Sequence, residues 1–534
     1  MPTPQTETTV LIVGAGPVGA VLAMELAHHG VRSVVVDRSP GPSRHPKMDF
    51  IHGRSMEHYR RLGLADPIRR HGVAPDHLFN FQWIETLDRP PVSVWEHPSV
   101  EQTRRRMAEV NDGTVPREPY QRVMGSRLEE LGRRQLSSLA LVDLREGWTF
   151  RGYTAEGDSV VAELAGPDGS HHVRARFLVG CDGANSTVRR AAGITVDDAT
   201  GPVEHRDVFF RSTDPVLRRN GLFFLTVASR GLTLVSRDGD QLWTGTFPLF
   251  DAAQRDADPV AVLRERLGVD FAVDEVLVVA HWEGRLAVAD AYRAGPVFIA
   301  GDAAHQFFPT GGHGANTGIG DAVNLGWKLA AVAQGWGGPA LLESYEAERR
   351  PVGLLNREFC GNLLDVWRRY PALAAAGAGR ARLTAFLERE RYQIHNTGIH
   401  FGDSYRGSPV VAGADDAEPA WDWTRIVATT TPGWRLPSVR LDDGTELHDL
   451  LGPELTLLDC SESKAGTAIA DEAAVHGIPL VHVAIEDPHV RSMLERPLVL
   501  VRPDQHVAWR GAAPADPGAV LDVVRGRREP GPGE

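Results

Sequence analysis

The chain is poor in cysteine: only Cys181, Cys360 and Cys460 occur among its 534 residues. Three cysteines cannot build a disulfide-stabilised domain, so we expect free thiols and a reducing, cytoplasmic environment. The chain also lacks an excess of positive charge, because its formal net charge is −13 at pH 7. This charge argues against a protein that binds nucleic acid through the phosphate backbone.

Long hydrophobic segments are lacking as well. The apolar stretch TTVLIVGAGPVGAVLAMELAHHG, which begins at Thr8, contains glycines typical of turns, and no Lys or Arg precedes it. We therefore reject a signal peptide. No other apolar run approaches the ~18 residues that a membrane-spanning helix requires, so we expect no membrane partner. A length of 534 residues predicts two or three domains.

Glycine, in contrast, is abundant, and a first cluster lies near the N-terminus. Gly14, Gly16 and Gly19 form G-x-G-x-x-G between a predicted strand and a predicted helix, and Asp37 ends the next predicted strand. In this setting the first glycine makes a turn, the second lets a pyrophosphate approach the backbone, and the third lets the helix pack on the strand. The acid binds a ribose hydroxyl group. The motif predicts a dinucleotide site but does not distinguish NAD from FAD.

Two further motifs follow predicted strands later in the chain. GCDGANSTVRR contains Asp182, Gly183 and Arg189, and GDAAH contains Gly301 and Asp302. Together with the first glycine motif, in this order, they make residues 7–360 resemble the flavoprotein aromatic hydroxylases of the p-hydroxybenzoate hydroxylase fold. Within that family the sequence most resembles hydroxylases of polycyclic, polyketide-type metabolites, which carry an additional C-terminal domain. The resemblance implies FAD as the cofactor.

The resemblance also implies which residues contact FAD. Asp302 would bind the ribityl chain, and the glycine-rich stretch after it would line the edge of the isoalloxazine ring. A helix that begins near Asn316 would direct its N-terminal amides at the reduced ring, although Asn316 and Thr317 are also ordinary N-cap residues. The expected cofactor-binding residues are Gly14, Gly16, Gly19, Asp37, Arg38, Lys47, Gln121, Asp182, Asp302, Pro309, Gly311, Gly312, Gly314, Ala315 and Asn316.

Lysine is scarce, with three residues against 54 arginines, which draws attention to Lys47 in the Pro-rich segment RSPGPSRHPKMDF. In the family this loop contacts the outer part of FAD, and the usual residue at the position of Lys47 is Arg. Phosphate binding is the simpler interpretation, and Lys47 is also the one weak candidate for a catalytic group. Apolar residues at helical spacing predict a helix over PYQRVMGSRLEELGRR, and its Gln121 matches a family position near the ribityl chain and pyrophosphate, although a solvent-facing Gln is also common. We expect His305 to make a local hydrogen bond and assign no role to His313.

The pattern predicts three units of an α/β protein. Residues 1–74, 112–198 and 285–398 would form a discontinuous, Rossmann-like FAD-binding domain, while 75–111 and 199–284 consist of predicted strands and turns. In the resembling fold this inserted β-sheet domain forms the substrate pocket. Residues 399–534 resemble a thioredoxin-like domain. Its Cys460 begins the sequence CSES, so Ser463 stands where a second redox cysteine would be, and no internal disulfide can form there. We therefore expect this domain to have a structural role, with a redox activity of the single thiol as the alternative.

The resemblance implies an FAD-dependent monooxygenase without a metal. NADPH or NADH would reduce FAD, O2 would add to give a C4a-hydroperoxide, and an oxygen atom would pass to a phenolic, polycyclic ring. Three alternatives stay open: Baeyer–Villiger oxygen insertion, a flavin-binding partner protein with little turnover of its own, and a hydroxylase of single-ring phenols. A fourth, an NAD-dependent dehydrogenase, is disfavoured by the two later motifs. The small aromatic substrate is the expected partner, and a homodimer is the predicted assembly.

Overall fold

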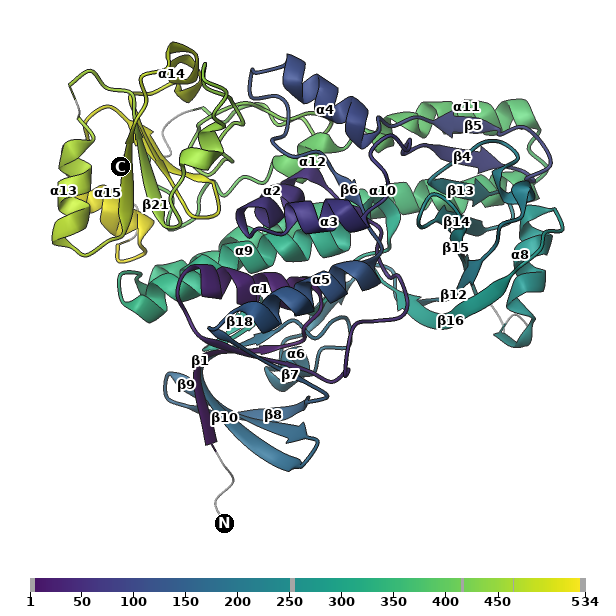
Figure 1. The fold of residues 1–534 in the computed structure, drawn as a ribbon, viewed down its shortest axis with the longest axis horizontal. Helices are drawn as coiled ribbons and strands as arrows, with labels where there is room; N and C mark the ends of the chain where they lie inside the picture. Colours follow the sequence, from purple (N-terminus) through teal and green to yellow (C-terminus); the bar gives the residue numbers. More distant parts are fainter. Residues whose placement is uncertain (1–4, 250–254, 414–416, 464, 529–534) are drawn as a thin grey trace.

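The computed structural model describes residues 5–249, 255–413, 417–463 and 465–528 (Figure 1). Its largest sheet has eight strands and forms the base of the FAD-binding unit. In spatial order the strands are β18 (Arg293–Ala294), β19 (Val297–Ile299), β10 (Gly169–Gly180), β1 (Gln5–Val13), β2 (Ser33–Asp37) and β7 (Val142–Glu146), with the hairpin β8 (Thr149–Glu156) and β9 (Ser159–Gly166) paired to β10.

The three strands that precede the sequence motifs are neighbours in this sheet. β1 pairs in parallel with β10, and β10 pairs in parallel with β19, so that Val13, Gly180 and Ile299 are at the same level. The loops that follow these residues therefore meet at one edge of the sheet, beyond the carboxyl ends of the strands. This is the place where open α/β sheets bind their ligands.

Helices pack closely on this sheet. α1 (Pro17–His28) contacts both α9 (His313–Gln334) and α5 (Gly125–Ser138). A Cβ at Gly326 of α9 would lie 2.6 Å from the Cβ of Glu25 in α1, so glycine allows the close approach of the two helices. The other helices of this unit are α2 (Gly53–Arg61), α3 (Ala65–His71), α6 (Thr187–Ala191), α10 (Pro339–Ala375), α11 (Arg380–Glu390) and α12 (Thr397–Phe401).

Two local expectations from the sequence were wrong. Gln121, which we placed in a helix, lies in β6 (Gln121–Arg122), which pairs with β3 (Phe50–Ile51), and the helix begins only at Gly125. The helix that we expected near Asn316 begins at His313, one turn earlier, after two glycines with positive φ. At the start of α9 the chain turns at glycines, a change of direction that side-chain periodicity does not reveal.

A second sheet, of seven strands, lies beside the FAD-binding unit, on the right in Figure 1. Its order is β16 (Glu275–Gly284), β12 (Val203–Arg211), β15 (Leu242–Pro248), β14 (Leu232–Ser236), β13 (Leu225–Ala228), β4 (Phe81–Ile84) and β5 (Ser93–Trp95). A small sheet of β11 (Val196–Asp198), β17 (Ala287–Ala289) and β20 (His305–Gln306) lies where the chain passes between the units.

We expected residues 75–111 and 199–284 to consist of strands and turns alone, and this was wrong. They also contain α4 (Val100–Glu109) and α8 (Pro259–Leu267). The start of α4 is fixed by a capping box, in which the side chains of Ser99 and Gln102 each accept a backbone amide of the other residue. The sequence S-x-x-Q was therefore a usable signal that the analysis of strand patterns overlooked.

The C-terminal unit has a mixed four-stranded sheet and is at the left in Figure 1. Its strands, in the order β22 (Leu480–Ala484), β21 (Leu455–Asp459), β23 (Leu498–Val501) and β24 (Val507–Gly511), accompany α13 (Thr467–Val475), α14 (Pro488–Leu494) and α15 (Pro517–Val524). Cys460 directly follows β21 as a free thiol, and burial raises its pKa to about 11. A thiol of this kind is a poor nucleophile at neutral pH, because only the thiolate reacts readily.

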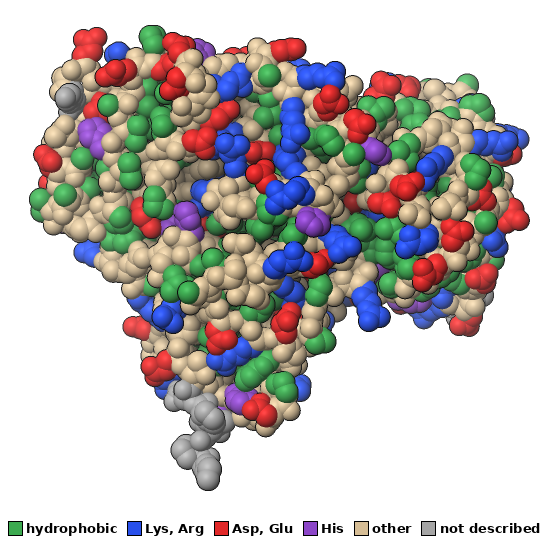
Figure 2. Space-filling view, viewed as in Figure 1, with side chains coloured by type: hydrophobic (Ala, Val, Ile, Leu, Met, Phe, Trp, Pro, Cys, Tyr) green, Lys and Arg blue, Asp and Glu red, His purple; other side chains and the backbone are tan. Residues whose placement is uncertain are grey.

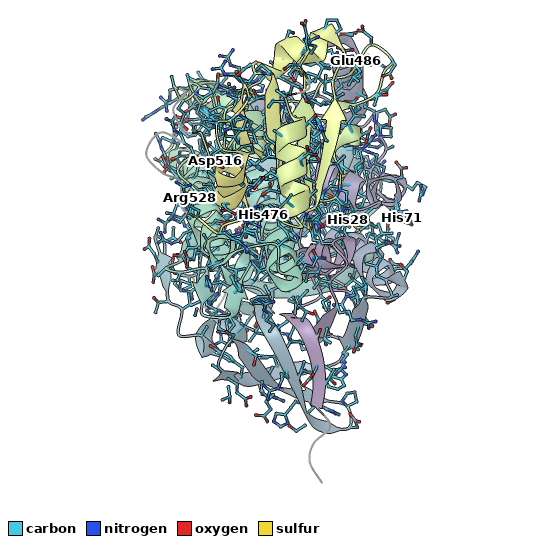
Figure 3. The ribbon with its side chains drawn as sticks, turned by 90° about the vertical axis from the view of Figure 1, so that its left-hand side faces the viewer. His28, His71, His476, Glu486, Asp516 and Arg528 are labelled. Carbon is cyan, nitrogen blue, oxygen red and sulfur yellow. The ribbon has the colours of Figure 1, made fainter. Side chains whose placement is uncertain are left out.

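The C-terminal unit shares its hydrophobic core with the FAD-binding unit. Trp327 of α9 and Leu341 of α10 belong to the same buried cluster as Leu455 and Leu498 of the C-terminal sheet. Nδ1 of His29, directly after α1, lies 2.8 Å from a carboxylate oxygen of Glu454. Figure 3 views the molecule from this side and shows His28, in the last turn of α1, near the boundary between the two units.

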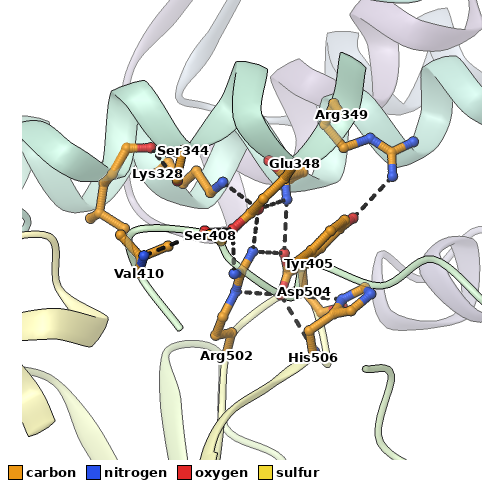
Figure 4. Close-up of polar contacts among 12 residues, drawn as sticks. Lys328, Ser344, Glu348, Arg349, Tyr405, Ser408, Val410, Arg502, Asp504 and His506 are labelled. Carbon is orange, nitrogen blue, oxygen red and sulfur yellow. Dashed lines mark hydrogen bonds and ion pairs between the residues drawn. The ribbon is translucent and has the colours of Figure 1, made fainter. Parts of the chain in front are cut away.

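Buried charges also cross this boundary (Figure 4). We call Lys328, Glu348, Arg502 and Asp504 the interdomain cluster. Nζ of Lys328 lies 2.6 Å from Oε2 of Glu348, whose two oxygens also accept bidentate hydrogen bonds of 2.7 and 2.8 Å from Arg502. Arg502 in turn pairs with Asp504 at 2.6 Å. The acids and bases are thus matched in number, and the cluster holds the C-terminal unit against α9 and α10.

The molecular surface carries charges of both signs. Figure 2 shows Lys and Arg side chains interspersed with Asp and Glu over the visible face. Among the described residues, no helix is both long and apolar enough to cross a membrane.

Candidate active site

A cavity of about 2190 Å³ lies where the three motif loops meet, and it extends beneath the seven-stranded sheet. Its floor comes from the ends of β1 and β2 and from the loops after β10 and β19, and its opposite wall comes from β4, β13, β14 and β16. Of the residues expected to contact the cofactor, the cavity is lined by Gly14, Gly16, Asp37, Arg38, Lys47, Asp182, Asp302, Pro309, Gly311, Gly312, Gly314 and Ala315.

The N-termini of two helices open into this cavity. Gly16 is the N-cap of α1 and Gly312 is the N-cap of α9, and neither helix has a side-chain hydrogen bond at its cap. A Cβ at Gly16 would have no other atom within 4 Å, so there is room for a ligand against the backbone. Free amide groups and the positive end of a helix dipole attract anionic groups. The two termini therefore suit a pyrophosphate at α1 and an electron-rich ring at α9.

The other two glycines of the first motif shape the loop. A Cβ at Gly19 would lie 1.9 Å from the carbonyl oxygen of Gly14, and a Cβ at Gly14 would lie 2.3 Å from that of Cys181. Gly14 also has a φ of 108°, which favours glycine. These close contacts hold the loop against the start of the second motif, so Gly19 acts by packing and does not line the cavity.

Asp37 at the end of β2 fixes the same loop. Its carboxylate accepts hydrogen bonds from the backbone amides of Ala15, at 2.7 Å, and Ser39, at 2.8 Å, and lies 3.3 Å from Arg133. Arg38, next to it, is exposed at the cavity wall. The carboxylate keeps further acceptor capacity on the cavity side, as a bond from a ribose hydroxyl requires.

The second motif is mainly architectural. Asp182 accepts hydrogen bonds from the hydroxyl of Ser186 and from the amide of Thr187, which begins α6. Arg189 spans the second and third motifs, because it donates to the carbonyl oxygens of Ala184, at 3.0 Å, and Ala303, at 2.8 Å. Gly183, directly after Asp182, has a positive φ of 79°, which favours glycine in this turn of the second motif.

Asp302 differs from these acids, because its carboxylate accepts no hydrogen bond from any described residue. The side chain is exposed to the large cavity. Desolvation by the surrounding protein nevertheless raises the pKa of the carboxyl group, while His305 and Lys47 act to lower it. The backbone around it is held from below. Asp321 accepts from the amide of Gly301, at 3.1 Å, and lies 2.8 Å from Nε2 of His305. His305 thus makes the local hydrogen bond that we expected of it.

The glycine loop after Asp302 needs its glycines for conformation as well as for access. Gly311 and Gly312 have φ values of 79° and 71°, and a Cβ at Gly312 would lie 2.8 Å from the ring of Phe50. Pro309, Gly314 and Ala315 complete the wall on this side. A flat ring could lie directly against this backbone, since no side chain projects from the glycines.

Besides Gly19, two expected residues do not line the cavity. The side chain of Gln121 is buried and is fully occupied by Arg69, Val73 and Arg122. Asn316 lies in the first turn of α9, where it donates to the carbonyl oxygens of Phe50, at 3.0 Å, and Gly312, at 2.7 Å. Asn316 therefore shapes the start of the helix without capping it, since Gly312 is the cap.

The opposite wall of the cavity comes from the inserted β-sheet domain, but none of its residues was assigned from the sequence. Phe79, Phe81 and Phe224 form an aromatic wall there, with the rings of Phe79 and Phe224 stacked at 4.5 Å. Arg237 of the seven-stranded unit lies in the same wall and donates from Nε to Thr244. Nearby, His45 lies 3.0 Å from Asp207. These residues come from segments far apart in the chain, and no local motif marks them.

Two parts of the chain match known protein families. Residues 7–358 match the family described as FAD binding domain, and residues 429–527 match the family described as aromatic-ring hydroxylase, C-terminal. The chain belongs to the FAD-binding aromatic-ring hydroxylases. It is 36% identical over 551 aligned residues to the FAD-dependent monooxygenase apdD of Emericella nidulans, covering 94% of this chain and 87% of that protein.

Solved structures of the family superpose over nearly the whole chain. The rebeccamycin biosynthetic enzyme RebC with reduced flavin matches with a TM-score of 0.85 and 33% identity, covering 98% of this chain and all of the other. The ternary complex of aklavinone-11 hydroxylase with FAD and aklavinone matches with a TM-score of 0.81 and 27% identity, covering 98% and 99%. As a member of this family, the protein is a flavin-dependent monooxygenase, and its large cavity fits FAD.

Proposed function

We propose that this monooxygenase hydroxylates a phenolic, polycyclic aromatic compound and is reduced by NADPH or NADH. The observation that carries the proposal is the size of the cavity, about 2190 Å³. Pockets for drug-sized ligands measure roughly 300–1,000 Å³. The cavity therefore has room for FAD together with a ligand of several fused rings, as in the related complex with FAD and aklavinone.

The residues divide between the two ligands. Asp37 would take a ribose hydroxyl, the N-terminus of α1 the pyrophosphate, Asp302 the ribityl chain, and the glycine loop before α9 the ring edge. The ammonium group of Lys47 lies near enough to Asp302 to lower its pKa, which supports a role in holding the cofactor over a role as catalytic base. The aromatic wall of Phe79, Phe81 and Phe224 would stack on the substrate.

Bound FAD would supply the activated oxygen as a C4a-hydroperoxide. The protein's own part is to place the aromatic ring, exclude water, and stabilise negative charge on the reduced ring through the amides at the start of α9. The nicotinamide coenzyme points to a cytoplasmic enzyme. A homodimer stays a prediction, which sedimentation velocity would test.

The proposal is tested by stopped-flow absorbance with NADPH, or NADH, and a panel of mono- and polycyclic phenols. We expect polycyclic phenols to accelerate flavin reduction, and O2 to produce a transient band before the oxidised spectrum returns. Product analysis by mass spectrometry then distinguishes a hydroxylated ring from the ring-expanded product of Baeyer–Villiger insertion. Flavin that no coenzyme reduces with any ligand would instead indicate a flavin-binding partner protein.

A matched pair of glycine variants tests the placement of FAD independently of turnover. In Gly16→Ala the new methyl group meets no protein atom, so the fold should persist while FAD affinity falls by tenfold or more, about 1.4 kcal/mol. In Gly19→Ala the methyl group meets the carbonyl of Gly14 at 1.9 Å, so the apoprotein itself should lose stability. If Gly16→Ala bound FAD as tightly as the wild type, the pyrophosphate could not lie there.

A further inference from the structure

A second, small cavity of about 30 Å³ lies behind the glycine loop, and five imidazoles line it, those of His52, His58, His313, His400 and His506. Three of them, those of His52, His313 and His400, are mutual neighbours. None was given a role from the sequence, and the proposed function uses none of them. His313 separates this cavity from the large one. It is the first residue of α9, it lines the small cavity, and a Cβ at Gly311, in the wall of the large cavity, would lie 2.9 Å from its Nε2.

The three imidazoles are packed against each other. The ring centroids of His52 and His400 are 4.6 Å apart, and those of His313 and His400 are 5.4 Å apart. Nε2 of His400 is buried and has no hydrogen-bond partner among the described residues. Buried polar nitrogen without a protein partner is costly, and a polar cavity of this size holds about one water molecule that can satisfy it.

The imidazoles are neutral at physiological pH. Burial lowers the pKa of His52 to about 3 and that of His313 to about 4, and burial together with the two neighbouring imidazoles lowers that of His400 well below 6.5. A neutral imidazole has one donor and one acceptor nitrogen, so it can accept a proton on one side while it releases a proton on the other.

The far side of the small cavity reaches the surface through Asp403. The side chain of Asp403 lines the cavity and is 25% exposed, and it lies 2.7 Å from Nη1 of Arg349. The hydroxyl of Tyr405 accepts a hydrogen bond of 3.0 Å from the same nitrogen. Polar groups therefore continue from the wall of the large cavity, through His313 and His400, to solvent at Asp403.

We propose that His313, His400 and the water-sized cavity between them and Asp403 carry protons between solvent and the flavin side of the large cavity. This inference rests on the proposed function. Hydroxylation consumes one proton from solvent per turnover, because substrate, O2, NAD(P)H and H⁺ give hydroxylated substrate, water and NAD(P)⁺. FAD and a polycyclic ligand that fill the large cavity exclude the water that could otherwise deliver this proton. The path behind the glycine loop avoids both ligands.

A metal site is not an alternative use of these histidines in the described part of the chain. No group of three or more His, Cys, Asp or Glu side chains there is arranged to hold a metal ion. His52 is the N-cap of α2, and its Nδ1 accepts a hydrogen bond from the backbone amide of Ser55. Its role in the cluster is therefore structural, and the proton path needs only His313 and His400.

The test follows proton uptake without turnover. The holoenzyme is reduced anaerobically by one equivalent of NADPH, or of NADH if that coenzyme reduces it, and mixed with O2 in the absence of substrate. Reoxidation takes up one proton, since the reduced flavin monoanion, O2 and H⁺ give oxidised flavin and hydrogen peroxide. A pH-indicator dye follows the proton while absorbance follows the flavin. The variants are His400→Phe, which keeps an aromatic ring, and His400→Gln and His313→Gln, which keep hydrogen-bonding groups.

We expect each variant to bind FAD with wild-type stoichiometry and melting temperature and to take up the proton at least about tenfold more slowly. His448→Phe is the control, because His448 is a buried imidazole outside both cavities. Flavin-loaded variants that take up the proton at the wild-type rate would overturn the path alone. A wild-type protein that held no flavin would overturn the proposed function first.

Discussion

Acidic side chains mark two regions of this molecule, one buried between units and one open to the large cavity, and the protein treats them in opposite ways. In the interdomain cluster both oxygens of Glu348 are bonded to Arg502, and Lys328 and Ser408 add further donors at 2.6 Å. At the large cavity the carboxylate of Asp302 has no such donor among the described residues and keeps a raised pKa. A desolvated carboxylate is costly unless it is paired.

The difference separates architecture from binding. Where donors and acceptors are fully matched, as between Glu348 and Arg502, no capacity is left for a ligand, and the charges hold two units together. Where a carboxylate is open to a cavity and unmatched, as at Asp302, its free hydrogen-bond acceptors are available to a ligand. The comparison predicts that changes in the first region alter stability, whereas changes in the second alter FAD affinity.

The largest effect should follow from Arg502→Ala. This change leaves Asp504 without its 2.6 Å partner and removes two hydrogen bonds from Glu348. Removing one partner of a buried pair typically costs about 3–5 kcal/mol. Urea unfolding of the apoprotein should show this loss. The control, Arg369→Ala, breaks a solvent-exposed pair with Asp365 and should change stability by less than about 0.5 kcal/mol. Equal effects of the two variants would contradict the comparison.

Acid should weaken the same region. Burial alone would raise the pKa of Glu348, but Arg502 and Lys328 lower it to about 2, against 4.5 for an ordinary glutamate. A lowered pKa adds stability that is complete above pH 4.5 and is lost as the pH falls towards 2. Each pH unit of this window is worth at most about 1.4 kcal/mol.

Urea unfolding at pH 7, 4.5 and 3 checks this effect. Glu348→Gln should be less stable than the wild type at pH 7, and the difference should narrow at pH 3, where the wild-type carboxylate begins to lose its advantage. Glu57 serves as an internal reference, because it is the same in both proteins. Burial would raise its pKa, but Arg435 and Arg54 lower it to about 2. A constant difference between the two proteins at all three values would argue against the role of Glu348.

At the cavity, Asp302→Asn should act on the cofactor. A hydrogen bond to a charged group contributes about 1.5–3 kcal/mol, so FAD affinity should fall roughly 10- to 150-fold. The variant apoprotein should be no less stable than the wild-type apoprotein, because the Asp302 side chain is exposed to the cavity and accepts no hydrogen bond from a described residue. Fluorescence titration of the apoprotein with FAD measures the affinity. A variant that lost stability but kept its affinity would place Asp302 with the interdomain cluster.

How far the sequence predicted this site depended on whether its parts are local. The three motif loops were predictable, because each follows an apolar strand and its glycines are required by backbone geometry, as at Gly14 and Gly312. Parallel pairing of β1, β10 and β19 then brings the loops together. The boundaries of elements were less predictable. Gln121 lies in a two-residue strand whose partner, Phe50–Ile51, is about 70 residues away.

The opposite wall and the small cavity could not be predicted. Phe79 and Phe224 stack across 145 positions of the chain, and His52, His313 and His400 meet from three separate elements. Such contacts depend on how the units pack, which no periodicity within one segment encodes. The interdomain cluster illustrates the same limit. Lys328 is conspicuous in a lysine-poor sequence, but its partner Glu348 was identifiable only from the packing of α9 against α10.

The two described lysines provide the smallest and most selective test. Lys328 is completely buried, and burial lowers its pKa to about 8 despite the charge of Glu348, whereas Lys47 is exposed at the rim of the large cavity. Lys47→Met should leave urea unfolding of the apoprotein unchanged within about 0.5 kcal/mol, as is usual for surface positions. It should weaken FAD binding a few-fold, and the weakening should shrink as salt is added, because salt screens exposed charges. Lys328→Met should destabilise the apoprotein at any salt concentration, since the buried Glu348 loses a donor. If Lys47 were instead a catalytic base, Lys47→Met would leave FAD affinity intact and lower the rate of hydroxylation after normal flavin reduction.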